Sequence, residues 1–559
     1  MNKTIIFLSF IIFSLLSFQY VNATLITSEA GTKRIQSIAI VIDENTYNQI
    51  KNEIDRFKID IINDLSTEEI EIQIFLYNGS WESADELREY FRDLYTDYDL
   101  IGAILIGDVP TYYYLTPVGS SSYPNFPSDY PFADLDCELI DSDNDGLIEN
   151  QNRSRYWGEI THREIWVSRI KPPINGSGGI ALLRQYFDRN HQYRTGGLPY
   201  QQKVLVLDSL SIFDNGYTEE QYMERWETVI NRTTLFDDST LLYSNIPNEL
   251  KQEYLNELKN PYEFGIAEIH GTPTKQIINI HVPSSESGRI NYTEILETNT
   301  EILFYLLESC SNARFDQDNY LGGWYLFSGS GLWVFGLTTP QAVPSDIEGL
   351  NTIRLFSLST GLTLGDIFKI LTDNPGFVSL GDPTLTIRAP VTSPKIVTDQ
   401  EIDFGGIEID TQKEVMINIS NVGSEKLIIN QVYNMYELVG GDYCPPEEMT
   451  CAEPFYQTLH NLKEIEINET KTFGIKFMPT TLPGVYRGVI ILITNDKDNP
   501  LFKIKLEGIG SGEGETLEIE TEHVIEITPI DTKEIIIRKC PAGCTCTEET
   551  ITCSIEEEM

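Results

Sequence analysis

From about residue 34 to residue 390, continuous apolar runs alternate with stretches that are amphipathic at helical spacing. The runs SIAIVID (37–43), IEIQIFLYN (70–78) and IGAILIGDVP (101–110) predict strands. The segments between them, NTYNQIKNEIDRF and SADELREYFRDLY, repeat apolar residues every three or four positions, which predicts helices. Continuous apolar strands separated by helices are typical of a parallel sheet that is covered on both faces.

The same alternation resumes after Gly197 and closes with the segment LGDPTLTIRAP (380–390). Its strands are predicted at KVLVLD, EFGIAEIH, ILFYLLES and GLWVFGL, with helices at TEEQYMERWETVI and around YLGGWYLFS. We therefore expect an α/β unit over 35–390, a doubly wound, mostly parallel sheet in two halves, about 35–180 and 197–390. Reactive groups in such sheets gather just beyond the carboxyl ends of strands. His270 and Cys310 both stand at such ends.

Beyond residue 390 the pattern changes to short alternating strands without helical stretches. Segments such as EVMINISNVG, KTFGIKFMP and GVYRGVIILITND predict an all-β sandwich over 398–510. Residues 511–559 read as an acidic linker followed by a cysteine-rich tail. At the other end, Lys3, an apolar stretch and small residues up to Ala23 predict a secretory signal peptide over 1–23. About a dozen residues separate it from the first strand, so we expect no long pro-domain.

The charge of the chain limits the kinds of partner it can bind. Aspartate and glutamate number 85 against 40 lysines and arginines, which gives a formal net charge of −45. Such a surface repels nucleic acid and anionic lipid, and it suits a secreted or cell-surface protein. No further apolar run reaches the length of a membrane span. We expect an extracellular protein that does not bind nucleic acid.

The cysteines fall into three groups. Cys444 and Cys451 bracket a short polar loop and are expected to pair in an oxidising compartment. The tail holds four more, which could form two disulfides of unknown pairing or bind zinc: Cys540, Cys544, Cys546 and Cys553. Cys137 and Cys310 stand apart, and each is either an inert core residue or a reactive thiol.

The residues around Cys310 favour the reactive interpretation. In SCSNARF, small polar residues surround the thiol where a strand passes into a loop. In EIHGTP, His270 is followed by Gly271, whose backbone N–H could face a reacting carbonyl oxygen. A thiolate, a base and an oxyanion donor are the minimum for acyl transfer. An inert cysteine at the end of a buried strand remains the alternative.

These motifs resemble those of the gingipain family of caspase-like cysteine peptidases. The strand-His-Gly and strand-Cys pair is joined, in the family order, by LIGDVP (105–110), PSDYPFADLD (127–136) and LGDPTLTI (380–387). The resemblance covers about 35–387. It implies Cys310 as nucleophile, His270 as base, and the N–H groups of Gly271 and Cys310 as the oxyanion hole.

The same resemblance extends to THREIWVSRI (161–170), the family segment in which a carboxylate precedes a strand. It implies that Glu164 orients His270, although Ser168 stands where the family usually has glycine. An ordinary strand-edge acid is the alternative for Glu164. His281, in INIHVPSS, is the rival base, but no glycine follows it, and a surface or packing histidine is the favoured interpretation.

The stretch DSDNDGLIEN (141–150) has the opening of an oxygen-rich calcium loop. Asp141, Asp143 and Asp145 occupy positions one, three and five, and glycine occupies position six. Position twelve is Asn152, so a complete EF-hand is not supported. We expect structural calcium at the three aspartates, with a solvated acidic turn as the alternative.

Taken together, the sequence predicts a secreted cysteine endopeptidase that acts on protein or peptide substrates. No redox cofactor is implied for catalysis. The sandwich resembles immunoglobulin-like accessory domains, which suggests cell-surface attachment through the C-terminal domain. Two alternatives stay open: a catalytically inactive adhesin or scaffold on the same fold, and a glycan-binding surface protein.

Overall fold

The structure is a computed structural model, and it describes residues 33–511 with internal gaps, together with the strand segments 544–546 and 551–553. For 152, 371, 430–439, 456–457 and the two tail segments only the backbone is described. The gaps are 68, 82, 117–124, 153–161, 232–234, 237, 341–354, 356–357, 359–360, 372–373, 388–393, 440–454, 458–463, 480–483, 497–498 and 500. The expected signal peptide, the acidic linker and the cysteine side chains from Cys444 onward lie outside the described side chains.

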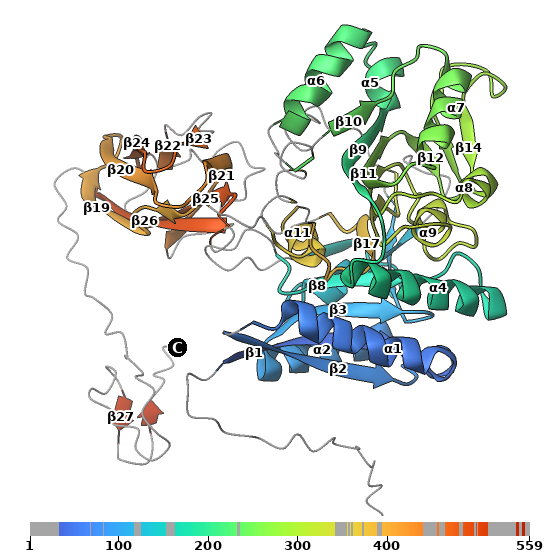
Figure 1. Cartoon of the computed structure of the whole chain (residues 1–559). Coiled ribbons are helices and arrows are strands. Elements are labelled where there is room, and N and C mark those ends of the chain that lie inside the picture. Colours follow the sequence, from blue (N-terminus) through green and yellow to red (C-terminus); the bar gives the residue numbers. More distant parts are fainter. Residues whose placement is uncertain are drawn as a thin grey trace, which may run out of the picture.

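A ten-stranded sheet forms the centre of the first unit (Figure 1). Its order is β10-β9-β11-β15-β16-β17-β8-β3-β1-β2, and neighbouring strands are parallel except at β16 and β17. The prediction of a mostly parallel α/β sheet is therefore confirmed. The strands are β1 Arg34–Ile42, β2 Ile70–Asn78, β3 Leu100–Ile106, β8 Trp166–Ile170, β9 Gln201–Asp208, β10 Asp238–Leu241, β11 Tyr262–Glu268, β15 Phe304–Glu308, β16 Trp333–Leu337 and β17 Phe377–Gly381.

The antiparallel contact divides the sheet into two halves that run in opposite directions. Strands β17, β8, β3, β1 and β2 point one way, and the remaining five strands point the other way. Strand β17, which comes last in the chain, therefore joins the N-terminal half to the half that carries His270 and Cys310.

Helices cover both faces of the sheet because side chains along each strand alternate between the faces. In β1, Ile38, Ile40 and Ile42 pack in one core with residues of helix α1 (Glu44–Leu65). Ala39 and Val41 belong to a separate core with residues of helix α2 (Ala84–Tyr98). Every residue of β1 from Ser37 onward is buried, as the continuous apolar run predicts.

Capping residues set where these helices begin. The Asp43 side chain accepts a hydrogen bond from the Thr46 N–H at the start of α1, and Ser83 does the same for the Glu86 N–H at α2. The other helices of this unit are α3 Tyr130–Ala133, α4 Gly176–Arg194, α5 Ser209–Phe213, α6 Glu219–Asn231, α7 Pro247–Glu257, α8 Tyr292–Thr298, α9 Leu321–Phe327 and α11 Leu364–Leu371. Short strands complete it: β4 Tyr112–Leu115, β5 Asn125–Ser128, β6 Glu138–Ile140, β7 Asn150–Asn152, β12 His270–Thr272, β13 Lys275–Ile277 and β14 Arg289–Asn291.

The second unit has two β-sheets over a common hydrophobic core. One sheet has the order β18-β20-β24-β22 and the other β19-β26-β25-β21-β23. The buried apolar residues that form this core lie between 396 and 506, and those of the first unit lie between 38 and 387. The strands are β18 Ile396–Val397, β19 Glu401–Glu408, β20 Lys413–Asn421, β21 Leu427–Val439, β22 Phe455–Gln457, β23 Glu464–Ile465, β24 Thr470–Phe477, β25 Gly484–Thr494 and β26 Leu501–Ser511.

Two further strands, β27 (Cys544–Cys546) and β28 (Ile551–Cys553), pair antiparallel in the tail. Among the helices that the structure describes, none combines the length and apolar character needed to cross a bilayer.

Candidate active site

Cys310 stands in a tight turn directly after the buried strand β15. The Ser309 carbonyl accepts a hydrogen bond from the Asn312 N–H at 3.2 Å, so Cys310 and Ser311 are the central residues of a β-turn. Ser311 has φ 59°, the left-handed conformation that the third position of a type II turn requires. A serine held there costs about 1 kcal/mol, so the surrounding structure must impose it.

Two backbone hydrogen bonds fix this turn on the end of the neighbouring strand β16. The Ser311 N–H donates to Thr339 O at 3.3 Å, and the Ala313 N–H donates to Leu337 O at 2.8 Å. Cys310 itself is partly exposed and forms no disulfide. The fold therefore presents the thiol on a constrained turn at the carboxyl end of β15.

His270 opens a hairpin that follows the fully buried strand β11. Strands β12 and β13 pair across the two-residue turn Pro273-Thr274, with His270 opposite Ile277 and Gly271 opposite Gln276. The His270 side chain is 22% exposed, and its Nε2 lies 2.7 Å from Asp214 Oδ2. The hairpin thus brings a partly buried imidazole to the carboxyl end of the strand next to β15.

Close packing at Gly271 joins the hairpin to the cysteine turn. A Cβ at Gly271 would lie 2.6 Å from Cys310 O and would also collide with Ser309 Oγ. Asn312 Nδ2 reinforces the contact by donating to the carbonyls of Thr272 and Lys275, at 3.1 Å for Lys275. The structure therefore brings the His-Gly pair and Cys310 into one site, and glycine is required because no side chain fits there.

Asp214 is a residue of this site that the sequence analysis missed. It follows α5, which begins directly after β9, and β9 is the neighbour of β11 in the sheet. Its two carboxylate oxygens meet two imidazoles, with Oδ2 toward His270 and Oδ1 3.2 Å from Nε2 of His281. In the sequence, Asp214 is only an acid shortly after a predicted strand. It reaches His270 because that strand, β9, lies beside β11, and the sequence does not show this strand order.

The expectation that Glu164 orients His270 is wrong in this structure. Glu164 precedes β8, and three strands separate β8 from β11 in the sheet. With neighbouring strands about 4.8 Å apart, β8 and β11 are roughly 19 Å apart across the sheet. The Glu164 carboxylate instead accepts a hydrogen bond from the Leu135 N–H. The carboxylate beside His270 belongs to Asp214.

Glu164 belongs to a compact group of acids with Asp134 and Asp136. Ligand-type oxygens of the three residues lie within 4.8 Å of one another. Burial, together with the nearby charge of Asp136, raises the pKa of Asp134 to about 7. Burial and the same acidic neighbours raise the pKa of Glu164 to about 7. Three carboxylates this close could hold a divalent cation, which would remove the cost of charging them.

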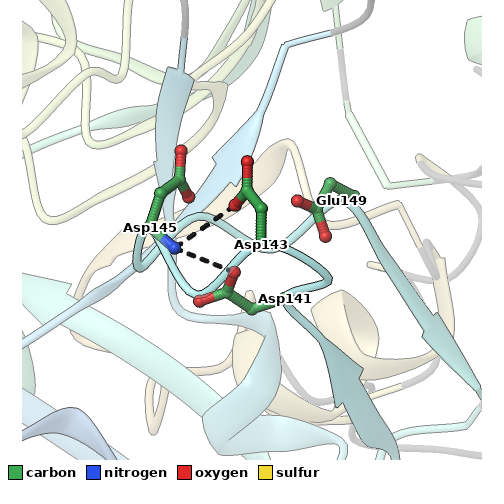
Figure 2. A group of neighbouring side chains, drawn as sticks. All are labelled: Asp141, Asp143, Asp145 and Glu149. Carbon is green, nitrogen blue, oxygen red and sulfur yellow. Dashed lines mark hydrogen bonds between the residues drawn. The ribbon is translucent and has the colours of Figure 1, made fainter.

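The predicted calcium loop forms a second acidic group (Figure 2). Asp141, Asp143 and Asp145 face a common centre, and the Asp145 N–H donates to Asp141 Oδ1 at 3.1 Å and to Asp143 Oδ1 at 3.3 Å. Gly146 adopts φ 86°, which suits glycine at this bend. Glu149, which the sequence analysis did not include, joins the group. Four carboxylates from one short loop match the oxygen ligands that Ca²⁺ prefers.

Comparison with known proteins gives weak structural likenesses. No family model matches the chain, and neither does any curated protein. A crystal structure of the Arg-specific cysteine proteinase gingipain R is 11% identical, with a TM-score of 0.42, covering 87% of this chain and 99% of that one. A complex of the pro- and mature domains of RgpB from Porphyromonas gingivalis is also 11% identical, with a TM-score of 0.42, covering 85% and 100%.

A third likeness covers only 22% of this chain and 87% of the other. It is to a PapD-like domain of human CEP192, at 15% identity and a TM-score of 0.17. Likenesses this weak carry no argument about function, so the chemistry of the site has to be judged from its own geometry.

Proposed function

We propose that this chain is a secreted cysteine endopeptidase with Cys310 as nucleophile and His270 as base. The observation that supports it most is the packing of Gly271 on the Cys310 turn, next to an imidazole already held by a carboxylate. A nucleophile, a base and an orienting group are the three parts that acyl transfer by a side chain requires.

Asp214 sets which nitrogen of His270 can act as the base. A carboxylate only accepts hydrogen bonds, so the Nε2 of His270 that faces Asp214 carries the proton. In the neutral imidazole the other nitrogen, Nδ1, is then unprotonated and can take the proton from the Cys310 thiol. Asp214 also stabilises the imidazolium that this transfer creates.

The proposed reaction has two steps, acylation of Cys310 and hydrolysis of the thioester. The Cys310 thiolate attacks the scissile carbonyl carbon, and the leaving amine takes the proton from His270 as the C–N bond breaks. The resulting thioester is attacked by water, whose proton goes to His270, and the carboxylic acid product leaves with the thiol restored.

The hairpin geometry supports an oxyanion hole that includes the Gly271 N–H. Residues that flank a two-residue hairpin turn form a hydrogen-bonded pair, and the next pair does not. Thr272 and Lys275 flank the turn, so the N–H of Gly271 in the following pair points away from β13. Strand β12 is an edge strand of its sheet, so the Gly271 N–H faces out of that sheet, where a carbonyl oxygen could accept from it. The Cys310 N–H is the second donor of the proposed oxyanion hole.

For the second unit we propose an immunoglobulin-like accessory domain that attaches or positions the catalytic unit. Its two sheets over one apolar core support this, since two packed β-sheets are the architecture of such domains. We also propose structural calcium at Asp141, Asp143 and Asp145, with Glu149 as a further oxygen ligand.

Alkylation of the full-length protein by iodoacetamide or an acyloxymethyl ketone tests the assignment. Mass spectrometry should place the adduct on Cys310, and Cys310→Ala should abolish peptide hydrolysis with an unchanged thermal midpoint. Cys137→Ala is the matched control, because Cys137 is only 1% exposed and should neither label nor affect activity. Hydrolysis by Cys310→Ala within a few-fold of the wild type would refute the nucleophile and favour the adhesin or scaffold alternative.

A further inference from the structure

Asp214 is the one carboxylate to which the described hydrogen bonds connect both histidines of this region. Three different segments meet there: the end of α5, the first residue of β12 and the loop that carries His281. The His281 backbone is held by its own N–H, which donates to Asn279 Oδ1 at 2.8 Å. His281 therefore approaches Asp214 from an ordered loop, although its side chain is 59% exposed.

The imidazole of His281 restricts the rotation of the Asp214 carboxylate, which the imidazole of His270 alone would not. A carboxylate bound through one oxygen can still rotate about its terminal torsion, which is broad in energy for aspartate. Bonds to Oδ1 and Oδ2 from two directions fix the plane of the group. The direction of the His270 Nε2–H bond, and with it the direction in which Nδ1 points, then depends on both contacts.

We propose that His281 is a positioning residue of the dyad, which holds Asp214 through Oδ1 so that Oδ2 keeps His270 aligned with Cys310. The inference rests on the proposed function for its meaning in catalysis. It assigns His281 neither a proton transfer nor a contact with substrate. The effect of His281 on catalysis must pass through Asp214. A histidine with only a structural role would not show this dependence on Asp214.

The experiment compares His281→Leu, which removes the donor, with His281→Gln, which keeps a donor at a similar reach. We expect kcat to fall about tenfold in His281→Leu, which corresponds to about 1.4 kcal/mol, with KM unchanged. His281→Gln should stay within about twofold of the wild type. The rate at which iodoacetamide alkylates Cys310, measured across pH, should show the same order of variants, because it reports the thiolate that His270 supports.

A double-mutant cycle then tests the route through Asp214. In an Asp214→Ala background, His281→Leu should cause no further loss, since the carboxylate on which it acts has gone. His191→Leu is the matched control: His191 also faces an aspartate, with Nδ1 2.9 Å from Asp60, but on helix α4, and it should leave both readouts unchanged.

Each outcome decides one question. Equal alkylation rates in the wild type, His281→Leu and His281→Gln overturn the inference, whether or not the chain cleaves peptides. A change in KM alone also overturns it, because that indicates contact with substrate. If alkylation of Cys310 depends on His281 as described but no peptide is cleaved, the proposed peptidase function fails and the positioning role stands.

Discussion

Adding a single methyl group at Gly271 should separate the two halves of the proposed dyad. In Gly271→Ala the new Cβ would lie 2.6 Å from Cys310 O and 2.9 Å from Asn312 Nδ2. The asparagine side chain can rotate away, but the carbonyl is part of the turn that carries the nucleophile. Since ordinary contact begins near 3.4 Å, the hairpin or the turn must move by about 0.8 Å.

This displacement allows the size of the effect to be estimated. Overpacking of a filled site typically costs about 1–3 kcal/mol, so the thermal midpoint should fall by a few degrees. Misplacement of reacting groups by about 1 Å can cost roughly a hundredfold in rate. We therefore expect kcat/KM on a peptide substrate to fall by one to two orders of magnitude while the protein stays folded.

Hydrolysis of a fluorogenic peptide, alkylation of Cys310 and thermal unfolding should be measured on the same preparations. Gly197→Ala is the matched control, because a Cβ there meets its nearest neighbour, Gln192 O, at an ordinary 3.5 Å. It should leave all three measurements near the wild-type values. If Gly271→Ala kept its stability and its activity within about threefold, the hairpin would not pack against the turn as described, and the dyad would lose its main support.

Three further predictions concern other parts of the chain. Burial raises the pKa of Glu164 from 4.5 to about 7, so its contribution to stability is complete below about pH 4.5 and is lost as the pH rises to about 7. Without divalent cations, Glu164→Gln should weaken this decline in the free energy of unfolding by about 1–2 kcal/mol, measured by urea unfolding at several pH values. The same pH dependence in wild type and variant would contradict the prediction. Chelation of calcium should lower the thermal midpoint, and the double variant Asp141→Asn/Asp145→Asn should not show this decrease. An unchanged midpoint in the wild type, with no calcium found by elemental analysis, would show that the loop is a turn without a bound ion. A chain truncated near Pro390 should still cleave small peptides, because the cores of the two units share no residue, and a soluble, monodisperse truncation without activity would show that the sandwich completes the site.

Much of the sheet could be predicted from the sequence because its signal is local. The central strands β1, β3, β11, β15 and β16 are mostly apolar runs, and burial along them confirms the expected covering on both faces. The positions of His270 and Cys310 followed from the same signal, since each stands just past the end of such a run. What brings them together, the fit of Gly271 against the turn, is a contact between residues 39 positions apart and leaves only a glycine in the sequence.

The error over Glu164 has a different origin, because it concerns the order of strands rather than their existence. Glu164 lies just before β8, and Asp214 follows the short helix that begins after β9, so strand prediction alone does not distinguish the two acids. The sheet order does: β9 borders β11, whereas β8 is separated from it by three strands. A side chain bridges from one strand end to the next because neighbouring strands are only about 4.8 Å apart. Of the two carboxylates, only Asp214 comes from the segment that follows a strand next to β11, and it is the one that contacts His270.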